Sequence, residues 1–295
     1  MSTPYYGPIT GSGIAHSLKE GIRRVIEFAN QDPRLLEAHQ KLGYGGKLDD
    51  FATNLDIGAQ EIFVKLIRED FPLFGIIAEE GGLYIPSRHA DHDIYVVCDG
   101  IDGTKALIRR QSDGIGTMVA VVCDGVIIAV YVGDIRTKEI YGYRPESDKV
   151  HRIHGYNKSE ELAINPSLLL HEQYVQLRDD QSIHSQLIQD LVRRGSGPFK
   201  SIEIRGGSIG IMMARLWKGE IGAVVLRPEV RTPWDETPIV GISQKMGFVF
   251  LRLEDGVFVQ DELRPIKTVQ PSEAKELLVI HRSRLGELNE WMQTR

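Results

Sequence analysis

The most hydrophobic part of the chain, GTMVAVVCDGVIIAVYVGD at residues 116–134, is interrupted at its centre by Asp124-Gly125. This dipeptide favours a tight hairpin turn, and the apolar residues on both sides are typical of buried strands. The run is therefore predicted to form two paired strands and not a membrane span. A meander of strands is expected over residues 116–144, with another turn at 134–137, and the first half of the chain is predicted to be mixed α+β.

Elements of both kinds are expected around this meander in the first half. A helix is predicted at 17–30, where Ser17 and Glu20 have the spacing of a capping box. A second helix is predicted at 54–69, because its apolar residues recur on one stripe and Phe71-Pro72 follow it. The segments FGIIAEE (74–80) and DIYVVCD (93–99) are predicted to be buried strands, and each ends in acidic residues.

The second half alternates predicted helices and strands after a polar connection at 151–165. Helices are expected at 180–194, at 208–218, in a short segment after Asp235 and at 285–292, and strands at 221–226 and 276–280, with a hairpin turning at Asp255-Gly256. This pattern divides the chain into an N-terminal α+β half (1–160) and a C-terminal α/β half (161–295).

The composition is ordinary for a globular protein, and a small-molecule substrate is the better expectation. The 295 residues are 42% apolar and 26% charged, and the formal net charge of −6 speaks against nucleic acid as a partner. The two cysteines, Cys98 and Cys123, lie in apolar runs and are expected to be reduced core thiols. The N-terminal residues lack the features of a targeting segment. We therefore expect a cytoplasmic protein with no membrane partner.

Acidic residues cluster where predicted elements end or begin. Glu79 and Glu80 end one strand, Asp99 and Asp102 lie at the end of another, and Asp235 begins a helix far downstream. Any one of these acids alone would be read as a solvated loop residue or a helix N-cap. Ligand sites, however, form in the loops at one edge of a sheet. Carboxylates gathered at such an edge repel one another unless a cation neutralises them. Oxygen ligands of this kind suit Mg²⁺, whereas no histidine pair has the spacing of a zinc helix.

One class of phosphatases has a sequence motif similar to residues 99–104. Phosphatases that form an aspartyl-phosphate carry Asp-x-Asp followed by Gly-Thr, and the first Asp is the nucleophile. Here Gly100 occupies the position two residues before Asp102. The nucleophile of that mechanism is missing, so water is predicted to attack the substrate.

Five segments in order resemble motifs of the inositol monophosphatase family. CDGIDGTK (98–105) is similar to its Asp-Pro-Ile/Leu-Asp-Gly-Thr signature, GIIAEEGG (75–82) to its upstream acidic pair and PWDETPIVG (233–241) to its Trp-Asp motif. ATNLD (52–56) and RGGSIGIMMARLWKGEIGAVV (205–225) also resemble family segments. The resemblance implies the layered α-β-α-β-α sandwich shared with fructose-1,6-bisphosphatase, and lithium-sensitive, Mg²⁺-dependent hydrolysis of phosphate monoesters, usually by a homodimer.

The resemblance also implies a set of metal ligands. One ion would be held by Glu79, Asp99 and the backbone carbonyl of Ile101, and a second by Asp99, Asp102 and Asp235. Two or three Mg²⁺ ions are expected for each site, with Mn²⁺ as a possible substitute.

The resemblance gives catalytic and phosphate-binding roles to neighbouring residues. The backbone N–H groups of Gly103 and Thr104 would bind the phosphate, and a side chain at Gly103 would crowd it. The Thr104 hydroxyl and Asp56 would together orient the attacking water. Glu80 would lie next to the metal ligands without binding the ion itself.

Three departures from the family pattern bear on activity and substrate. Gly100 replaces the usual proline, which is expected to loosen the turn, and Glu236 adds a negative charge after Asp235. Where inositol-phosphate members carry a glutamate, this chain has Pro228 followed by Glu229.

The substrate is expected to be a small phosphorylated metabolite, and an inositol monophosphate-like ester is the first expectation. Lys105 resembles the lysine of bisphosphate nucleotidases and histidinol-phosphate phosphatases, and a sugar bisphosphatase is a further alternative. Lys105, Arg205, Ser208 and Glu229 are the candidate substrate contacts, and Arg109, Arg110 and Arg231 are further basic residues near the motifs. A protein of another class, which binds phosphate for regulation without turnover, is the remaining alternative.

Overall fold

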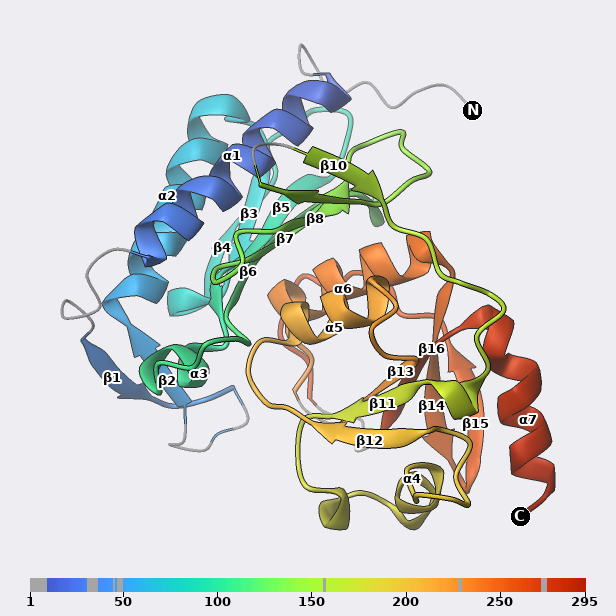
Figure 1. Ribbon diagram of the computed structural model, residues 1–295. Coiled ribbons are helices and arrows are strands. Elements are labelled where there is room, and N and C mark those ends of the chain that lie inside the picture. The colour runs from blue at the N-terminus through green and yellow to red at the C-terminus, as the bar shows by residue number, and fades with distance from the viewer. Residues whose placement is uncertain are drawn as a thin grey trace.

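Two β-sheets, with helices between and outside them, organise the chain in the computed structural model (Figure 1). The structure describes residues 10–30, 37–44, 46, 50–155, 158–227, 230–271 and 275–295. Seven α-helices are found in these parts of the chain: α1 (Gly11–Ala29), α2 (Asn54–Asp70), α3 (Thr104–Ile108), α4 (Gln186–Leu191), α5 (Ile209–Trp217), α6 (Pro233–Met246) and α7 (Leu285–Gln293).

The first sheet contains eight strands in the order β10-β9-β8-β7-β6-β5-β3-β4. Its strands are β3 (Gly75–Ala78), β4 (Leu83–Ile85), β5 (Ile94–Asp102), β6 (Gly116–Cys123), β7 (Val126–Asp134), β8 (Ile140–Tyr143), β9 (His151–His154) and β10 (Lys158–Glu161). The predicted hairpin is confirmed, because β6 pairs with β7 in antiparallel register from Gly116 opposite Asp134 to Cys123 opposite Val126.

The second sheet contains six strands in the order β12-β11-β13-β16-β14-β15. Its strands are β11 (Tyr174–Leu177), β12 (Ser201–Ile204), β13 (Ala223–Leu226), β14 (Phe248–Glu254), β15 (Val257–Asp261) and β16 (Leu277–His281). A separate hairpin of β1 (Ala38–Lys41) and β2 (Asp50–Thr53) precedes α2. None of the described helices is long and apolar enough to cross a membrane.

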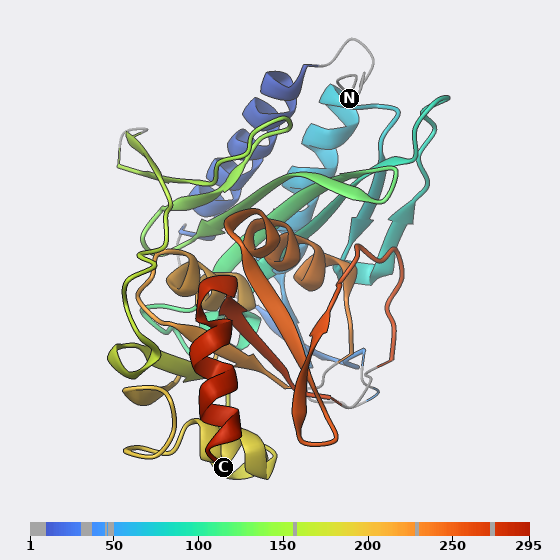
Figure 2. The ribbon, with the colours of Figure 1, turned by 90° about the vertical axis from the view of Figure 1, so that its right-hand side faces the viewer.

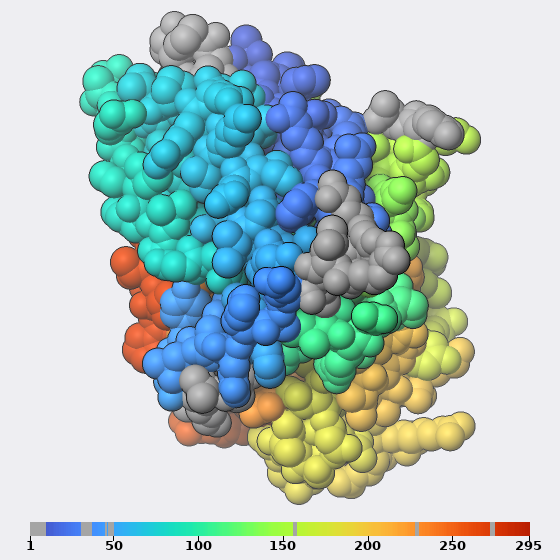
Figure 3. All heavy atoms as spheres, turned by 90° about the vertical axis from the view of Figure 1, so that its left-hand side faces the viewer, coloured from blue at the N-terminus to red at the C-terminus, as the bar shows by residue number. Residues whose placement is uncertain are grey.

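Apolar cores join five layers of secondary structure. Helices α1 and α2 pack on one face of the eight-stranded sheet and form the outer surface shown in Figure 3. Helices α5 and α6 lie between the two sheets, where Met118 from β6 and Phe250 from β14 join the same core. On the far face of the second sheet, Leu288 of α7 and Val225 of β13 belong to one apolar core, and α7 stands in front of that sheet in Figure 2. The predicted α-β-α-β-α sandwich is confirmed.

The first helix begins earlier than its predicted capping box. Thr10 is the N-cap of α1, and its hydroxyl accepts a hydrogen bond from the N–H of Gly13. Ser17 is buried inside the helix, where its hydroxyl donates to Asp70 at 2.6 Å. The prediction at Ser17 was wrong because the apolar stripe continues upstream to Ile14, and Ser17 joins α1 to the end of α2 instead.

The polar segment at 151–165 is also not a plain connection. Residues 151–154 and 158–161 form β9 and β10, which extend the eight-stranded sheet by antiparallel pairing. Every residue of β10 is exposed, so this edge strand carries no alternation of apolar and polar residues that a sequence pattern could detect.

Candidate active site

Strand β5 brings two aspartates to one edge of the first sheet. Asp99 and Asp102 are 3% and 7% exposed, and the pairing of β5 with β6 is irregular between them. A bulge of this kind changes the direction of the side chains that follow it. Asp102 is held by the N–H of Gly210 at 2.7 Å, by the N–H of Ile209 at 3.2 Å and by the hydroxyl of Ser208. The start of α5 therefore fixes the orientation of Asp102.

Helix α6 supplies a third aspartate from the other half of the chain. The helix begins at Pro233 with Thr232 as its N-cap, so Asp235 lies in its first turn and not before a short helix as predicted. Proline suits the first helical position, since it has no N–H that would remain unpaired there. The hydroxyl of Thr232 donates to Asp235 Oδ2 at 2.6 Å. This bond orients the carboxylate, while the N-cap position itself belongs to Thr232.

The three aspartates converge on one point. Each of Asp99, Asp102 and Asp235 offers a carboxylate oxygen, and these oxygens lie within 4.8 Å of one another. Burial, followed by repulsion from Glu79 and the other acids, raises the pKa of Asp99 well above its usual range. Such a group is costly to keep ionised without a counter-charge. The all-oxygen donor set fits a hard divalent cation such as Mg²⁺.

Glu79 and Glu80 lie beside this cluster and share a lysine. Lys41 Nζ is 2.9 Å from Glu79 Oε1 and 2.7 Å from Glu80 Oε1. Burial raises the pKa of Glu79. The positive charge of Lys41 opposes this rise, and the negative charge of Asp235 adds to it. The phenol of Tyr44 donates to the carbonyl of Glu79 at 2.7 Å. The sequence prediction missed Lys41 because no apolar periodicity marks the exposed strand β1, and only the tertiary fold brings it to the acids.

Thr104 and Asp56 form a hydrogen-bonded pair next to the aspartates. Thr104 Oγ1 donates to Asp56 Oδ1 at 2.6 Å. The other oxygen of Asp56 accepts the N–H of Thr53 at 2.7 Å and the Thr53 hydroxyl, in the capping box that begins α2. The Thr104 hydroxyl proton is thus directed to Asp56, which leaves oxygen lone pairs to accept a further hydrogen bond.

A sequence-family model decides what kind of protein carries this arrangement. The model of the inositol monophosphatase family matches residues 14–286, which is most of the chain. The chain belongs to the inositol monophosphatase family. Among curated relatives, Nus factor SuhB of Salmonella typhimurium (strain 14028s / SGSC 2262) is 35% identical over 86 residues. That alignment covers 29% of this chain and 29% of the relative.

Solved structures with family names share the fold over nearly the whole chain. An inositol monophosphatase/NADP phosphatase, solved with NADP and Ca²⁺, has a TM-score of 0.72 at 19% identity, and the match covers 97% of this chain and 96% of that one. The extragenic suppressor protein SuhB of Bartonella henselae has a TM-score of 0.71 at 12% identity, with 95% and 98% covered. At these identities the likeness establishes the family fold alone.

Close backbone packing accounts for two glycines in this chain of the inositol monophosphatase family: Gly103 of the signature, and Gly100, which replaces its usual proline. Gly103 has a φ of 96°, and a Cβ there would lie 2.5 Å from the carbonyl oxygen of Gly114. The protein's own backbone therefore requires glycine before any phosphate is considered. At Gly100 a Cβ would lie 2.8 Å from the N–H nitrogen of Gln60. Close packing of α2 on β5 leaves no room for a side chain here, and the expected loosening of the turn stays a prediction.

The candidate substrate contacts occupy different settings in this family member. Ser208 is buried, caps α5 through the N–H of Ile211 at 2.9 Å and contacts Asp102. Arg205 is half exposed and pairs with Asp113 at 3.3 Å. Lys105 is exposed at the start of α3. Glu229 lies outside the described residues. Their roles toward a substrate stay predictions, although Ser208 already has a structural partner in Asp102.

The extra charge of Glu236 is neutralised by an arginine just before α6. Arg231 Nε donates to Glu236 Oε2 at 2.6 Å, and a second nitrogen of the same guanidinium contacts Oε1. A bidentate pair of this kind holds both partners firmly. The Glu236 carboxylate is therefore paired with the Arg231 guanidinium beside the site. Both side chains are held in this ion pair.

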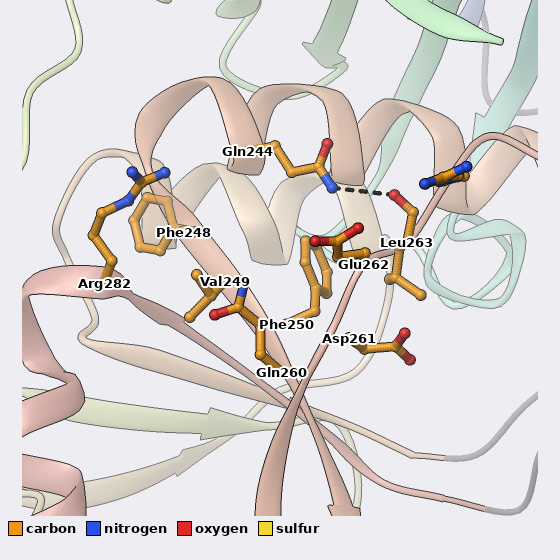
Figure 4. Close-up of a pocket in the computed structure, with 10 residues that line it drawn as sticks. Gln244, Phe248, Val249, Phe250, Gln260, Asp261, Glu262, Leu263 and Arg282 are labelled. Atoms are coloured by element: carbon orange, nitrogen blue, oxygen red, sulfur yellow. Dashed lines mark hydrogen bonds between the residues drawn. The ribbon is translucent and has the colours of Figure 1, made fainter.

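A cavity of about 350 Å³ lies between the end of α6, β14 and the segment after β15 (Figure 4). Gln244 in its wall donates to the carbonyl of Leu263 at 3.1 Å, and Phe248, Glu262 and Arg282 also line it. It shares no residue with the aspartate cluster, and about 14 Å of helix separate Gln244 from Asp235. The cavity is therefore distinct from the candidate active site.

Removing the charge of Lys41 should change how the site responds to Mg²⁺. Because its ammonium contacts Glu79 and Glu80, Lys41→Met should lower the Mg²⁺ concentration needed for half-maximal activity several-fold and lower the melting temperature without Mg²⁺. Lys41→Arg keeps the charge and is the matched control. A higher Mg²⁺ requirement in Lys41→Met would show that the lysine assists the cation instead of competing with it.

Proposed function

We propose that the protein is a Mg²⁺-dependent phosphomonoesterase that hydrolyses a small phosphorylated metabolite with water as nucleophile. The observation that carries the proposal is the convergence of Asp99, Asp102 and Asp235, from two distant parts of the chain, within 4.8 Å. Membership of the inositol monophosphatase family supports the reaction class. Structural neighbours are described in complex with Mg²⁺ and phosphate, and with D-inositol-1-phosphate, which supports the metal and the substrate class.

The residues that would hold the cations are those that the family resemblance implies, and the grouping of the three aspartates supports one of the two sets. Asp99, Asp102 and Asp235 would hold one Mg²⁺, and Glu79, Asp99 and the carbonyl of Ile101 would hold another. When bound, the ions neutralise the buried carboxylates, favour ionisation of water and draw negative charge from the phosphate. Lys41 supplies part of the same neutralisation at Glu79 in the structure.

Thr104 and Asp56 would position the attacking water. Because Thr104 donates its proton to Asp56, its oxygen is directed to accept a proton of the water. The second carboxylate oxygen of Asp56 accepts hydrogen bonds from Thr53. Burial raises the pKa of Asp56, and the hydrogen bonds from Thr104 and Thr53 partly oppose that rise. The pair therefore provides a fixed acceptor for the water, with a buried carboxylate behind it.

The start of α3 would receive the phosphate. The first N–H groups of a helix have no acceptor within that helix, and Gly103 and Thr104 stand at this point next to Asp102. The left-handed conformation of Gly103 directs the chain from the strand into the helix. Donors for the phosphate and acceptors for cations then lie on consecutive residues of one segment.

A substrate screen tests the proposal and separates the alternatives. Purified protein with Mg²⁺ should release phosphate from at least one of the following: inositol monophosphates, NADP, nucleoside 3′,5′-bisphosphates, sugar bisphosphates and histidinol phosphate. Preference for a bisphosphate would favour a nucleotidase or sugar bisphosphatase, in line with Lys105 and Arg205 near the site. Binding of these compounds without phosphate release would support the non-catalytic alternative and overturn the proposal.

We also propose that the protein is a cytoplasmic homodimer, as the family resemblance implies. The mass of the purified protein in solution, measured by light scattering, tests the dimer directly. A monomeric mass at working concentration would contradict it.

A further inference from the structure

A second group of metal-ligand side chains lies at the opposite end of β5 from the aspartates. His92, Cys123 and Asp124 each offer one ligand atom, and these atoms lie within 4.8 Å of one another. His92 stands two residues before β5 begins, and the seven residues from His92 to Asp99 span about 23 Å when extended. The group therefore shares nothing with the candidate active site.

The sheet holds these side chains together from two separate segments. Ile94 at the start of β5 pairs with Cys123 at the end of β6. Beyond this pair, Asp124 N–H donates to the carbonyl of Asp93 at 2.9 Å, and Asp93 N–H donates to Asp124 Oδ1 at 2.9 Å. Backbone pairing, and not chance contact of long side chains, brings the turn before β5 next to the β6–β7 hairpin.

Hydrogen bonds hold the three side chains together, and the His92–Asp124 pair would have to widen to admit an ion, whereas the Cys123–Asp124 separation already fits a coordination shell. His92 Nδ1 is 2.7 Å from Asp124 Oδ2, and Cys123 Sγ is 3.8 Å from the same oxygen. Ligand atoms around a tetrahedral zinc ion, at bond lengths of about 2.0–2.3 Å, lie roughly 3.3–3.8 Å apart. We propose that His92, Cys123 and Asp124 form a second cation site, which binds zinc or a similar borderline divalent ion.

The chemistry of the donors distinguishes this ion from Mg²⁺. A thiolate and a carboxylate carry two negative charges, and with a neutral imidazole they balance a divalent cation. Nitrogen and sulfur ligands favour zinc or cobalt, whereas Mg²⁺ prefers oxygen. The side chains of His92 and Asp124 are 27% and 53% exposed, so water can reach the fourth coordination position. The two sites of the chain would thus select different metals.

Binding there would join two turns that the fold otherwise connects by hydrogen bonds. A cation that binds the folded chain and not the unfolded one raises the melting temperature, and the rise grows with the free concentration of the cation. It would also release the Cys123 proton, because the thiolate is the ligand, so affinity should rise with pH. This effect does not depend on phosphatase activity.

A cobalt titration of the full chain tests the site. With excess Mg²⁺ present to occupy the carboxylate cluster, Co²⁺ should produce saturable thiolate-to-cobalt charge-transfer absorption, and Zn²⁺ should abolish it by displacement. Cys123→Ser should remove this absorption, and Cys98→Ser, which changes the other cysteine in the buried core, should retain it. No thiolate absorption in the unchanged protein, or absorption that persists in Cys123→Ser, would overturn the proposal.

A second variant covers the case in which Cys123→Ser does not fold. Asp124 has a φ of 50°, a conformation that asparagine also tolerates, so Asp124→Asn should keep the hairpin. It should weaken Zn²⁺ binding by about 10-fold or more and reduce the zinc-dependent rise in melting temperature. Equal zinc stabilisation in Asp124→Asn and the unchanged protein would contradict the site. Neither readout uses turnover, so a failure here leaves the proposed phosphatase function standing.

Discussion

Replacing Asp235 by asparagine should lower phosphatase activity at least about 100-fold at ordinary Mg²⁺ and greatly raise the Mg²⁺ concentration needed for activity. The variant loses one negative charge and one strong oxygen ligand from a cluster whose members lie within 4.8 Å. Asparagine still accepts the hydrogen bond from Thr232, so the first turn of α6 should remain in place. The effect should therefore come from the cation and not from the helix.

The melting temperature gives the same prediction an independent readout. Without Mg²⁺, Asp235→Asn should be as stable as the unchanged protein or more stable, because one member of a repelling group has been neutralised. Asp255→Asn, which removes a charge in an exposed hairpin turn, is the control and should leave the Mg²⁺ curve unchanged. If Asp235 only supports the helix start, its Mg²⁺ curve would match that of the control, and Asp235 would have to leave the site.

Thr104→Ala should lower kcat about 100-fold while KM changes little. The hydroxyl that it removes donates to Asp56 at 2.6 Å and is the acceptor assigned to the attacking water. The backbone N–H of residue 104 remains, so phosphate binding at the start of α3 should persist.

Thr104→Ser is the matched control for this prediction, because it keeps the hydroxyl and loses only a methyl group. It should retain most of the activity. A loss in Thr104→Ala that falls mainly on KM, or an equal loss in Thr104→Ser, would assign the residue to substrate positioning and not to the water.

The sequence located the acids because the signals that mark them are local. Asp99 and Asp102 follow an apolar strand, and Asp235 follows a proline that starts a helix, so each is visible within a few residues. The layered fold was likewise predictable from the family motifs and the hairpin at Asp124-Gly125. Both kinds of inference depend on short stretches of chain.

The partners of those acids were not predictable, because they meet only in the folded protein. Lys41 comes from an exposed hairpin strand and reaches Glu79 across 38 positions of chain, and Ser208 reaches Asp102 across 106. No periodic pattern marks either contact. The close packing of α2 at Gly100 has the same character, since it depends on the distance between a helix and a strand.

The most direct test of the central claim is metal dependence. Purified protein should be stripped with a chelator, dialysed and assayed with the best substrate from the screen, before and after addition of Mg²⁺ or Mn²⁺. Because Asp99, Asp102 and the partly buried Asp235 form a mutually repelling group, the stripped protein should be inactive and should recover when either ion is restored. Full turnover in the presence of excess chelator would contradict the account.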